Sequence, residues 1–206
     1  DVEDLALRAG LDRADMGLLA SADALSTLAG HRRQQVWAAT VNRRPRGLLQ
    51  EAPVHEDLLR LPAGGEGEDI VFDHAALGLS LRRHPLALLR DRLGALGWRS
   101  AGALQSLADG RTARACGLIT MRQRPGTAKG VMFISLEDET GGVNVVVWPD
   151  LVEKQRDVWL RARLLAVEGT WQRDEESAGR VRHLIARRAH DLSHLLGRLA
   201  ELGRSR

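Results

Sequence analysis

Cysteine is almost absent from this sequence: Cys116 is the single thiol among 206 residues. One cysteine can form no internal disulfide, and it cannot build a metal site that needs several thiolates. The same scarcity is typical of a reducing compartment, so we expect a cytoplasmic protein. We expect Cys116 itself to be a small buried side chain in a strand.

Long apolar runs are also absent, and none approaches the roughly 18 residues that a membrane-spanning helix needs. We therefore expect no membrane partner. The opening segment DVEDLALRAG has no initiator methionine, no basic leader and no apolar stretch, so we expect no signal peptide. We expect instead that these residues continue a longer chain.

Lysine is nearly absent as well, since Lys129 and Lys154 are the only two among 30 basic residues. The net charge is +3, but it is unevenly distributed. Residues 51–80 contain seven acidic residues and one basic residue, whereas basic residues outnumber acidic ones between 111 and 190. An acidic connector followed by a basic C-terminal half suits a polyanion as the partner of that half.

Helical patterns dominate the first half of the chain. Asp12 is expected to cap one helix, Gly30 to end the next, and Pro85 to occupy the first turn of a later one. The segment before that later helix is rich in proline, glycine and acids, which is typical of a linker. We predict helices at 1–47, an acidic linker at 48–70, a helical connector at 71–110, a β-rich domain at 111–190 and a short amphipathic tail at 191–206.

From Arg111 the apolar period changes to two, which indicates β-strands. The predicted strands are 111–121, 130–137, 142–148, 163–172 and 180–189, with a helix at 150–162. Five strands with a helix between the third and fourth are the layout of an OB-fold, a partly open Greek-key barrel. A mixed α/β unit with a parallel sheet is the alternative, but short turns join most strands, which favours antiparallel pairing. The predicted fold class is α+β, a helical region followed by a five-stranded OB-fold β-barrel.

The second predicted strand contains the main candidate for ligand binding. Met132, Ile134 and Leu136 share one face and are expected in the core, whereas Phe133 and Ser135 occupy the other face. An exposed aromatic ring on a barrel face can stack against an unpaired base, so we predict that Phe133 binds nucleic acid. The alternative is that Phe133 only packs under a loop.

The third predicted strand repeats this alternation and places Asn144, Val146 and Trp148 on the outer face. Asn144 is predicted to hydrogen-bond to nucleic acid near Phe133. Trp148 precedes Pro149 and the predicted helix, so we expect it to pack under that helix or a loop.

Basic side chains surround the second strand. Arg122, Arg124 and Lys129 lie on the loop before it, one of the loops with which OB-folds bind nucleic acid. Such side chains contact phosphates and position a strand without reading its sequence. Arg114 in the first strand and Arg182 in the fifth are predicted to extend this basic track. Simple solvation of scattered arginines is the alternative interpretation.

The sequence contains no constellation typical of catalysis. Glu137, Asp138 and Glu139 lie together, but a β-turn capped by Asp138 explains them better than a metal site does. His190 and His194 are the one pair of histidines at i, i+4 spacing, and no third ligand accompanies them. We therefore predict no metal, no cofactor and no catalytic residue.

Several long stretches carry a resemblance to a known family. RQRPGTAKGVMFISLEDETG and VVVWPDL resemble the C-terminal region of the C-family bacterial DNA polymerases, in their error-prone, damage-inducible branch. That branch is paralogous to the alpha subunit of the replicative polymerase III. RAGLDRADMGLLASADALSTLAGHRRQQVWA is similar to the end of the helix-hairpin-helix region of the same family. The resemblance covers nearly the whole chain.

The resemblance implies an OB-fold that holds single-stranded template DNA during translesion synthesis, in the repair and replication of damaged DNA. It also implies a nucleotidyltransferase whose catalytic carboxylates lie upstream, so this segment alone should not polymerise. The implied partners are a Y-family-like subunit, a RecA-like subunit and the sliding clamp. Replicative alpha subunits carry a clamp-binding peptide with a Leu-Phe pair, whereas QEAPVHEDLL contains Leu58 and Leu59 without Phe. Clamp binding is therefore expected to be indirect.

Two functions from different classes stay open. The first is a DNA-binding module, and the second is a protein-interaction module that docks accessory subunits, with the apolar face of the tail as its marker. That face consists of Leu192, Leu195, Leu196 and Leu199. The anticodon-binding OB-folds of aspartyl-type tRNA synthetases show a similar second strand, with its aromatic residue stacked on a base. This similarity supports Phe133 but does not distinguish DNA from RNA.

Overall fold

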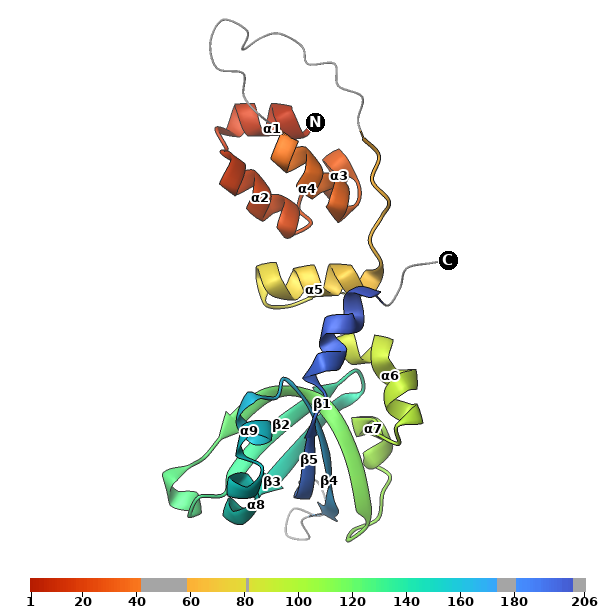
Figure 1. The fold of residues 1–206 in the computed structure, drawn as a ribbon, viewed down its shortest axis with the longest axis vertical. Coiled ribbons are helices and arrows are strands. Elements are labelled where there is room, and N and C mark those ends of the chain that lie inside the picture. Colours follow the sequence, from red (N-terminus) through yellow and green to blue (C-terminus); the bar gives the residue numbers. More distant parts are fainter. Residues whose placement is uncertain (42–58, 81, 174–180, 202–206) are drawn as a thin grey trace, which may run out of the picture. The chain divides into compact units, whose positions relative to one another are not determined.

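The computed structural model describes residues 1–41, 59–80, 82–173 and 181–201 (Figure 1). These residues form two compact units, a helical unit within residues 1–82 and a barrel unit within residues 83–199. In these described parts of the chain, every helix is too short or too polar to cross a bilayer.

The helical unit consists of short helices (Figure 1). Its helices are α1 (Val2–Ala9), α2 (Arg13–Ser21), α3 (Ser26–Ala29), α4 (Arg32–Val41) and α5 (Glu66–Leu77). The core is formed by Val2, Ala6, Met16, Ala20, Leu25 and Ala39. The first four helices lie within the region that was predicted to be helical.

Two helix boundaries follow the predicted signals. The Asp12 carboxylate accepts a hydrogen bond from the N–H of Asp15 at 2.9 Å, and the Asp15 carboxylate accepts one from the N–H of Asp12 at 3.0 Å. This reciprocal capping box confirms Asp12 as the N-cap of α2. Gly30 ends α3 with φ at 75°, a conformation that glycine adopts without steric cost.

Helix α5 begins at Glu66, inside the segment that we expected to be linker. Its first turn is acidic, which suits the positive end of the helix dipole. Glu68 then forms an ion pair with Arg33, and Asp73 pairs with the buried Arg32 at 2.5 Å. These pairs with α4 stabilise a helix whose first five residues, 66–70, had the composition of a linker, whereas residues 71–77 were predicted to be helical. Residues 48–58 of the expected linker lie outside the described residues.

The barrel unit contains the predicted five-stranded barrel (Figure 1). Its strands are β1 (Thr112–Gln123), β2 (Met132–Asp138), β3 (Gly141–Val147), β4 (Leu164–Arg173) and β5 (Arg182–Asp191). The strand order is β1-β2-β3-β5-β4 and the barrel is closed. Strands β3 and β5 pair in parallel, and all other neighbouring strands pair antiparallel. The OB-fold prediction is therefore confirmed, with strand bounds shifted by at most two residues.

Side chains of the barrel alternate between core and surface as their spacing predicted. Met132, Ile134 and Leu136 are at most 4% exposed and belong to the main core. Trp159 and Trp171 fill the same core and are fully buried. Full burial of one large apolar side chain contributes about 1.5–3 kcal/mol, so this alternation fixes the register of the strands.

The helix predicted between the third and fourth strands is broken in two. Helix α8 covers Pro149–Lys154 and helix α9 covers Arg156–Arg161. The break falls at Gln155, whose φ of −126° and ψ of 37° are not helical. The Gln155 amide donates to the Ala189 carbonyl at 2.9 Å and accepts from the Ala189 N–H at 3.0 Å. This two-bond contact with β5 provides the physical reason for the break.

Two helices before the barrel are tied to it through the acidic turn. They are α6 (Pro85–Ala95) and α7 (Ala101–Leu104), and Pro85 starts α6 as predicted. The buried Asp138 carboxylate accepts hydrogen bonds from the N–H of Thr140 at 2.8 Å and the N–H of Ala101 at 2.7 Å. Arg90 of α6 donates to Asp138 at 3.0 Å and also binds Glu139. The prediction of a turn capped by Asp138 is confirmed.

Candidate nucleic-acid interface

The outer face of β2 and β3 presents an exposed aromatic ring. Phe133 is 41% exposed and lies opposite Gln123 of β1 and Val146 of β3. The residues before and after it in β2 are at most 4% exposed, so the strand alternation points Phe133 away from the core. The prediction that Phe133 is exposed on the barrel face is therefore confirmed.

Polar side chains lie beside Phe133 on the same face. Ser135 is opposite Asn144, and its hydroxyl donates to Asn144 Oδ1 at 3.1 Å. Asn144 in turn lies opposite His183 of β5. Because Ser135 occupies the amide oxygen of Asn144, the amide nitrogen retains donors for a ligand acceptor. This polar row and Phe133 together provide a stacking surface with hydrogen-bonding groups next to it.

The loop before β2 holds two of the predicted cations. Arg124 and Lys129 are exposed, and neither forms an ion pair with another described residue. Lys129 ends the short 3-10 helix η1 (Gly126–Ala128) in a left-handed conformation with φ at 47°. A Cβ atom on Gly130 would lie 3.3 Å from Arg124 Nη2 and 3.4 Å from Pro149 Cγ. The Arg124 guanidinium therefore folds back toward the start of α8.

Arg122 has internal partners that sequence reasoning did not anticipate. Its Nε donates to the Trp159 carbonyl at 2.9 Å, and its Nη2 donates to the Ala162 carbonyl. Both acceptors lie at the C-terminal end of α9, where carbonyl groups lack intrahelical partners. Burial lowers the pKa of the Arg122 guanidinium below its ordinary value, but arginine stays charged at neutral pH.

The Arg114 and Arg182 side chains bind groups outside the Phe133 surface. The Arg114 guanidinium stacks on the Trp98 ring at 4.2 Å and pairs with Glu168 at 3.2 Å. It is nine residues along β1 from Gln123, a distance of about 30 Å at 3.3 Å per residue. Arg182 donates to the Gln105 carbonyl at 2.9 Å, at the end of α7.

Trp148 is the functional candidate that sequence reasoning missed. We expected its ring to pack under the helix or a loop, but it is 54% exposed. Its neighbour Val147 is fully buried, so strand alternation places Trp148 on the same face as Val146 and Phe133. The expectation was wrong because Pro149 turns the chain into α8 without covering the indole. The alternation itself was the signal that could have identified the site.

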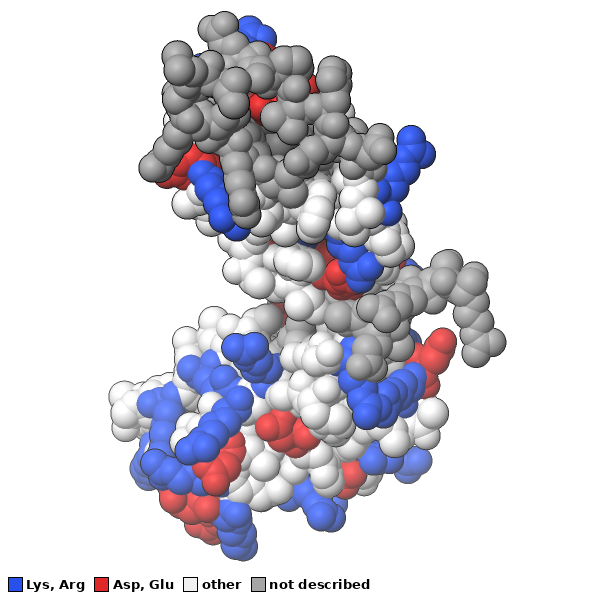
Figure 2. All heavy atoms as spheres, turned by 45° about the horizontal axis from the view of Figure 1, so that its top comes forward, with Lys and Arg blue, Asp and Glu red and all other residues white. Residues whose placement is uncertain are grey.

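A small pocket of about 230 Å³ opens next to this face. Its apolar lining is Met132, Val152 and Leu160, and its basic lining includes Arg124 and Arg156. In Figure 2, Lys and Arg side chains gather at the lower left of the barrel unit, with Asp and Glu side chains among them. The face of the barrel unit seen in Figure 2 is therefore mixed in charge, with local basic clusters.

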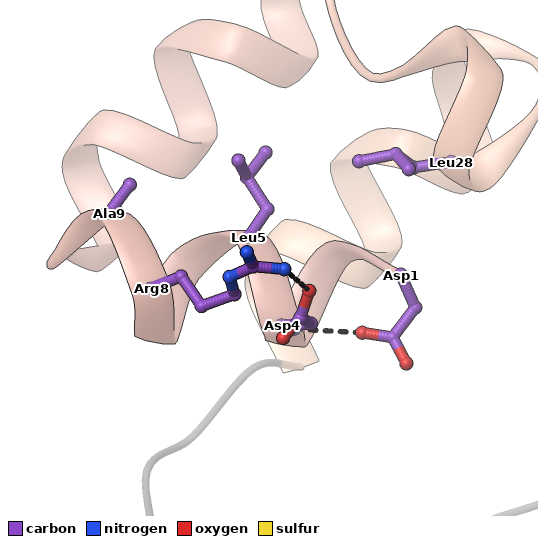
Figure 3. Close-up of a pocket in the computed structure, with 6 residues that line it drawn as sticks. All are labelled: Asp1, Asp4, Leu5, Arg8, Ala9 and Leu28. Atoms are coloured by element: carbon purple, nitrogen blue, oxygen red, sulfur yellow. Dashed lines mark hydrogen bonds and ion pairs between the residues drawn. The ribbon is translucent and has the colours of Figure 1, made fainter.

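A second pocket, of about 320 Å³, lies in the helical unit (Figure 3). Arg8 donates to the Asp4 carboxylate at 3.3 Å, and the Asp1 carboxylate accepts from the N–H of Asp4 at 2.8 Å. Figure 3 shows these charged groups directed at one another. The charged side chains that line this pocket are thus already hydrogen-bonded within α1 and its cap. The apolar side chains of Leu5 and Leu28 also line the pocket.

Cys116 is the one thiol of the described residues. Cys116 is buried, and burial raises the pKa of its thiol to about 12, so the thiol stays protonated at neutral pH. This agrees with the expected role of Cys116 as a small core residue. Within the described ranges, no group of three or more His, Cys, Asp or Glu side chains could hold a metal ion.

The barrel is similar to a known class of nucleic-acid-binding domains. Residues 113–192 match the family model described as an OB-fold nucleic acid binding domain. A crystal structure of asparaginyl-tRNA synthetase from Pyrococcus horikoshii is 25% identical over a match that covers 41% of this chain and 20% of that chain, with a TM-score of 0.34.

The whole chain is similar to one kind of enzyme. It is 53% identical over 206 residues to the error-prone DNA polymerase of Ralstonia nicotianae and 50% identical to that of Ralstonia pickettii. Each match covers 98% of this chain and 19% of the relative. The match falls in the C-terminal part of these polymerases, so the resemblance seen in the sequence is confirmed. The chain spans about a fifth of the length of these curated relatives.

Proposed function

We propose that the outer face of β2 and β3 holds single-stranded template DNA for an error-prone DNA polymerase. The observation that carries this proposal is the exposed Phe133 ring, with Asn144 beside it on a closed OB-fold barrel. Aromatic side chains on such barrels stack against unpaired bases of any sequence. A polymerase that copies damaged templates needs to bind the template independently of its base sequence.

Phosphate contacts support the same proposal. Arg124 and Lys129 lie on the loop that enters β2, close in sequence to Phe133. Arg122 and Arg182, in contrast, donate to backbone carbonyls, so fewer cations are available for DNA than the sequence suggested. We therefore propose Arg124 and Lys129 as the main phosphate contacts and Arg114, Arg122 and Arg182 as secondary ones.

Replacing Phe133 by alanine is expected to weaken binding of a fluorescein-labelled oligo(dT) by about 1–3 kcal/mol, because one stacked base loses its platform. Fluorescence anisotropy on the 206-residue chain measures the change in Kd. Trp37→Ala is the matched control, since Trp37 is an aromatic residue of equal exposure, 41%, in the helical unit. Equal affinities for Phe133→Ala and wild type would contradict the proposed site.

Replacing Arg124 and Lys129 together by glutamine is expected to flatten the salt dependence of binding. With two or three phosphates neutralised, the wild-type slope of log affinity against log salt should be about −1 to −2. Loss of both cations should make this slope less steep by about 1.4, that is, about 0.7 for each phosphate contact to a single strand. Arg8→Gln is the control, because the Arg8 side chain is 80% exposed in the other unit. An unchanged slope for the double variant would exclude these residues as phosphate contacts.

A comparison of oligo(dT) with oligo(U) of equal length addresses the choice between DNA and RNA. Stacking on Phe133 does not depend on the sugar, whereas a polar contact to the 2′-hydroxyl would favour RNA. A template-holding function predicts DNA affinity at least equal to RNA affinity. A clear preference for RNA would contradict the template role while leaving the barrel a nucleic-acid-binding domain.

The burial of the tail's leucines argues against the alternative, a protein-interaction module that docks accessory subunits. Leu195 and Leu199 of the 3-10 helix η2 (Ser193–Glu201) are 1% and 3% exposed, so the apolar face required for docking is largely covered. The proposed accessory partners, a Y-family-like and a RecA-like subunit, therefore need another surface. Most of the QEAPVHEDLL segment, on which indirect clamp binding was argued, lies outside the described residues.

A further inference from the structure

Two exposed aromatic rings lie on the same face of the hairpin formed by β2 and β3. Phe133 is opposite Val146, and the strand pairing ends one residue later, at Val147. Trp148 follows as the extended N-cap of α8, so continued alternation places it diagonal to Phe133. Diagonal neighbours in an antiparallel pair are about 7–8 Å apart, within reach of aromatic side chains. Their exposed fractions, 41% and 54%, leave both ring surfaces accessible to a ligand.

The backbone under Trp148 is firmly anchored. Its carbonyl accepts hydrogen bonds from the N–H groups of Leu151 at 3.0 Å and Val152 at 3.1 Å, the first turn of α8. Pro149 follows directly and fixes the start of that helix. The indole is therefore attached to a rigid junction of strand and helix, so little backbone entropy would be lost when a ligand stacks on it.

A cation lies near the junction of strand and helix that carries Trp148. The Arg124 guanidinium approaches Gly130, and Gly130 packs against Pro149, the residue after Trp148. A phosphate group that links two stacked nucleotides carries one negative charge beside its bases. The cluster of Phe133, Trp148 and Arg124 thus combines two flat apolar surfaces with a nearby positive charge, as a short stretch of single-stranded nucleic acid requires.

We propose that Trp148 is a second stacking platform and that Phe133, Trp148 and Arg124 together bind a dinucleotide step. One base stacks on each ring, and Arg124 contacts the phosphate between them. This inference rests on the proposed nucleic-acid function of the barrel face and adds to it a residue and a minimal ligand. Binding is independent of base identity, because every base has a flat apolar face.

The test measures oligo(dT) affinity for Trp148→Leu, Trp148→Phe and Phe133→Leu in the 206-residue chain. Leucine keeps apolar volume without the ring, and phenylalanine keeps a ring. We expect Trp148→Leu to weaken binding about 5- to 150-fold and Trp148→Phe to retain most of the affinity. Trp37→Leu is the control for an exposed tryptophan outside the barrel. Circular dichroism on each variant verifies that the barrel is intact.

The double variant Phe133→Leu with Trp148→Leu distinguishes two platforms from one shared base. Independent platforms predict that the two fold-changes multiply, whereas one base held between both rings predicts that the second substitution adds little. An unchanged affinity for Trp148→Leu, with Phe133→Leu still impaired, would overturn this inference and leave the proposed function intact. A failure of the wild-type chain to bind oligo(dT) at low salt would overturn both.

Tryptophan fluorescence gives a second readout that does not depend on affinity. Trp98, Trp159 and Trp171 are at most 6% exposed, so a stacked base would quench mainly Trp148. We expect oligo(dT) to quench the emission of the wild-type chain and of Trp37→Leu, and to quench Trp148→Phe much less. Equal quenching in Trp148→Phe would contradict contact between the base and this indole.

Discussion

Gly169→Ala is expected to destabilise the barrel by about 3 kcal/mol or more, the largest effect of any single substitution considered. A Cβ atom on Gly169 would lie 2.1 Å from the Ile185 carbonyl oxygen and 2.9 Å from its carbonyl carbon. Both are backbone atoms, so β5 itself would have to move away from β4. The pairing of the two strands is already irregular between Glu168 and Gly169. A glycine at this irregularity is what allows the strands to approach.

Urea denaturation followed by tryptophan fluorescence measures this effect, because Trp159 and Trp171 are buried in the barrel core. Gly94→Ala is the control: Gly94 lies in α6, and its Cβ would meet no atom within 4 Å. That substitution should be neutral or stabilise by up to about 1 kcal/mol, since alanine favours helix. Equal midpoints for Gly169→Ala and wild type would show that the close approach of the strands is not required.

Asp138→Asn is expected to lower the free energy of unfolding by about 3 kcal/mol. The substitution removes the charge and replaces one acceptor oxygen by an NH2 donor. The carboxylate accepts hydrogen bonds from Arg90, Ala101 and Thr140 and is 5% exposed. An asparagine amide would direct an N–H group toward one of these donors and leave it unsatisfied. The connection of α6 and α7 to the barrel would weaken.

Glu139→Gln provides the matched control for this turn. Glu139 also binds Arg90 but accepts no backbone hydrogen bond among the described residues. Its replacement loses one of the two hydrogen bonds that Arg90 donates to it, so it should cost about 1.5 kcal/mol, the lower end of the range for a bond to a charged group, because Glu139 is only partly buried. The two variants are compared by thermal unfolding at pH 7. A larger loss for Glu139→Gln than for Asp138→Asn would contradict the clamp role of Asp138.

The barrel could be predicted from the sequence because the signals for each strand lie within that strand and its flanking turns. The alternation around Ile134 and the spacing of turns specify strands and their buried faces without knowledge of partners. The first turn of α5, at residues 66–70, and the break at Gln155 could not be predicted, since they depend on partners distant in sequence. Glu68 is stabilised by Arg33, and the side-chain amide of Gln155 forms two hydrogen bonds with the backbone of Ala189.

The candidate site was predictable in part for the same reason. Phe133 followed from strand alternation, which reports exposure directly. The guanidinium groups were harder to assign, because arginine is long enough to reach carbonyls that the sequence does not place nearby. Arg122 reaches α9 and Arg182 reaches the end of α7. Positive charge counted along a strand therefore overstates the charge that a ligand encounters.

The parallel pairing of β3 with β5 gives the proposed site a thermodynamic role in the barrel. This seam closes the barrel, and its register runs over Asn144, Val145 and Val146. The same stretch of β3 carries the polar row beside Phe133. A ligand that binds only when the seam is closed lowers the free energy of the closed barrel relative to forms in which β3 and β5 separate. Occupancy of the face and closure of the barrel are thus coupled equilibria, so each promotes the other.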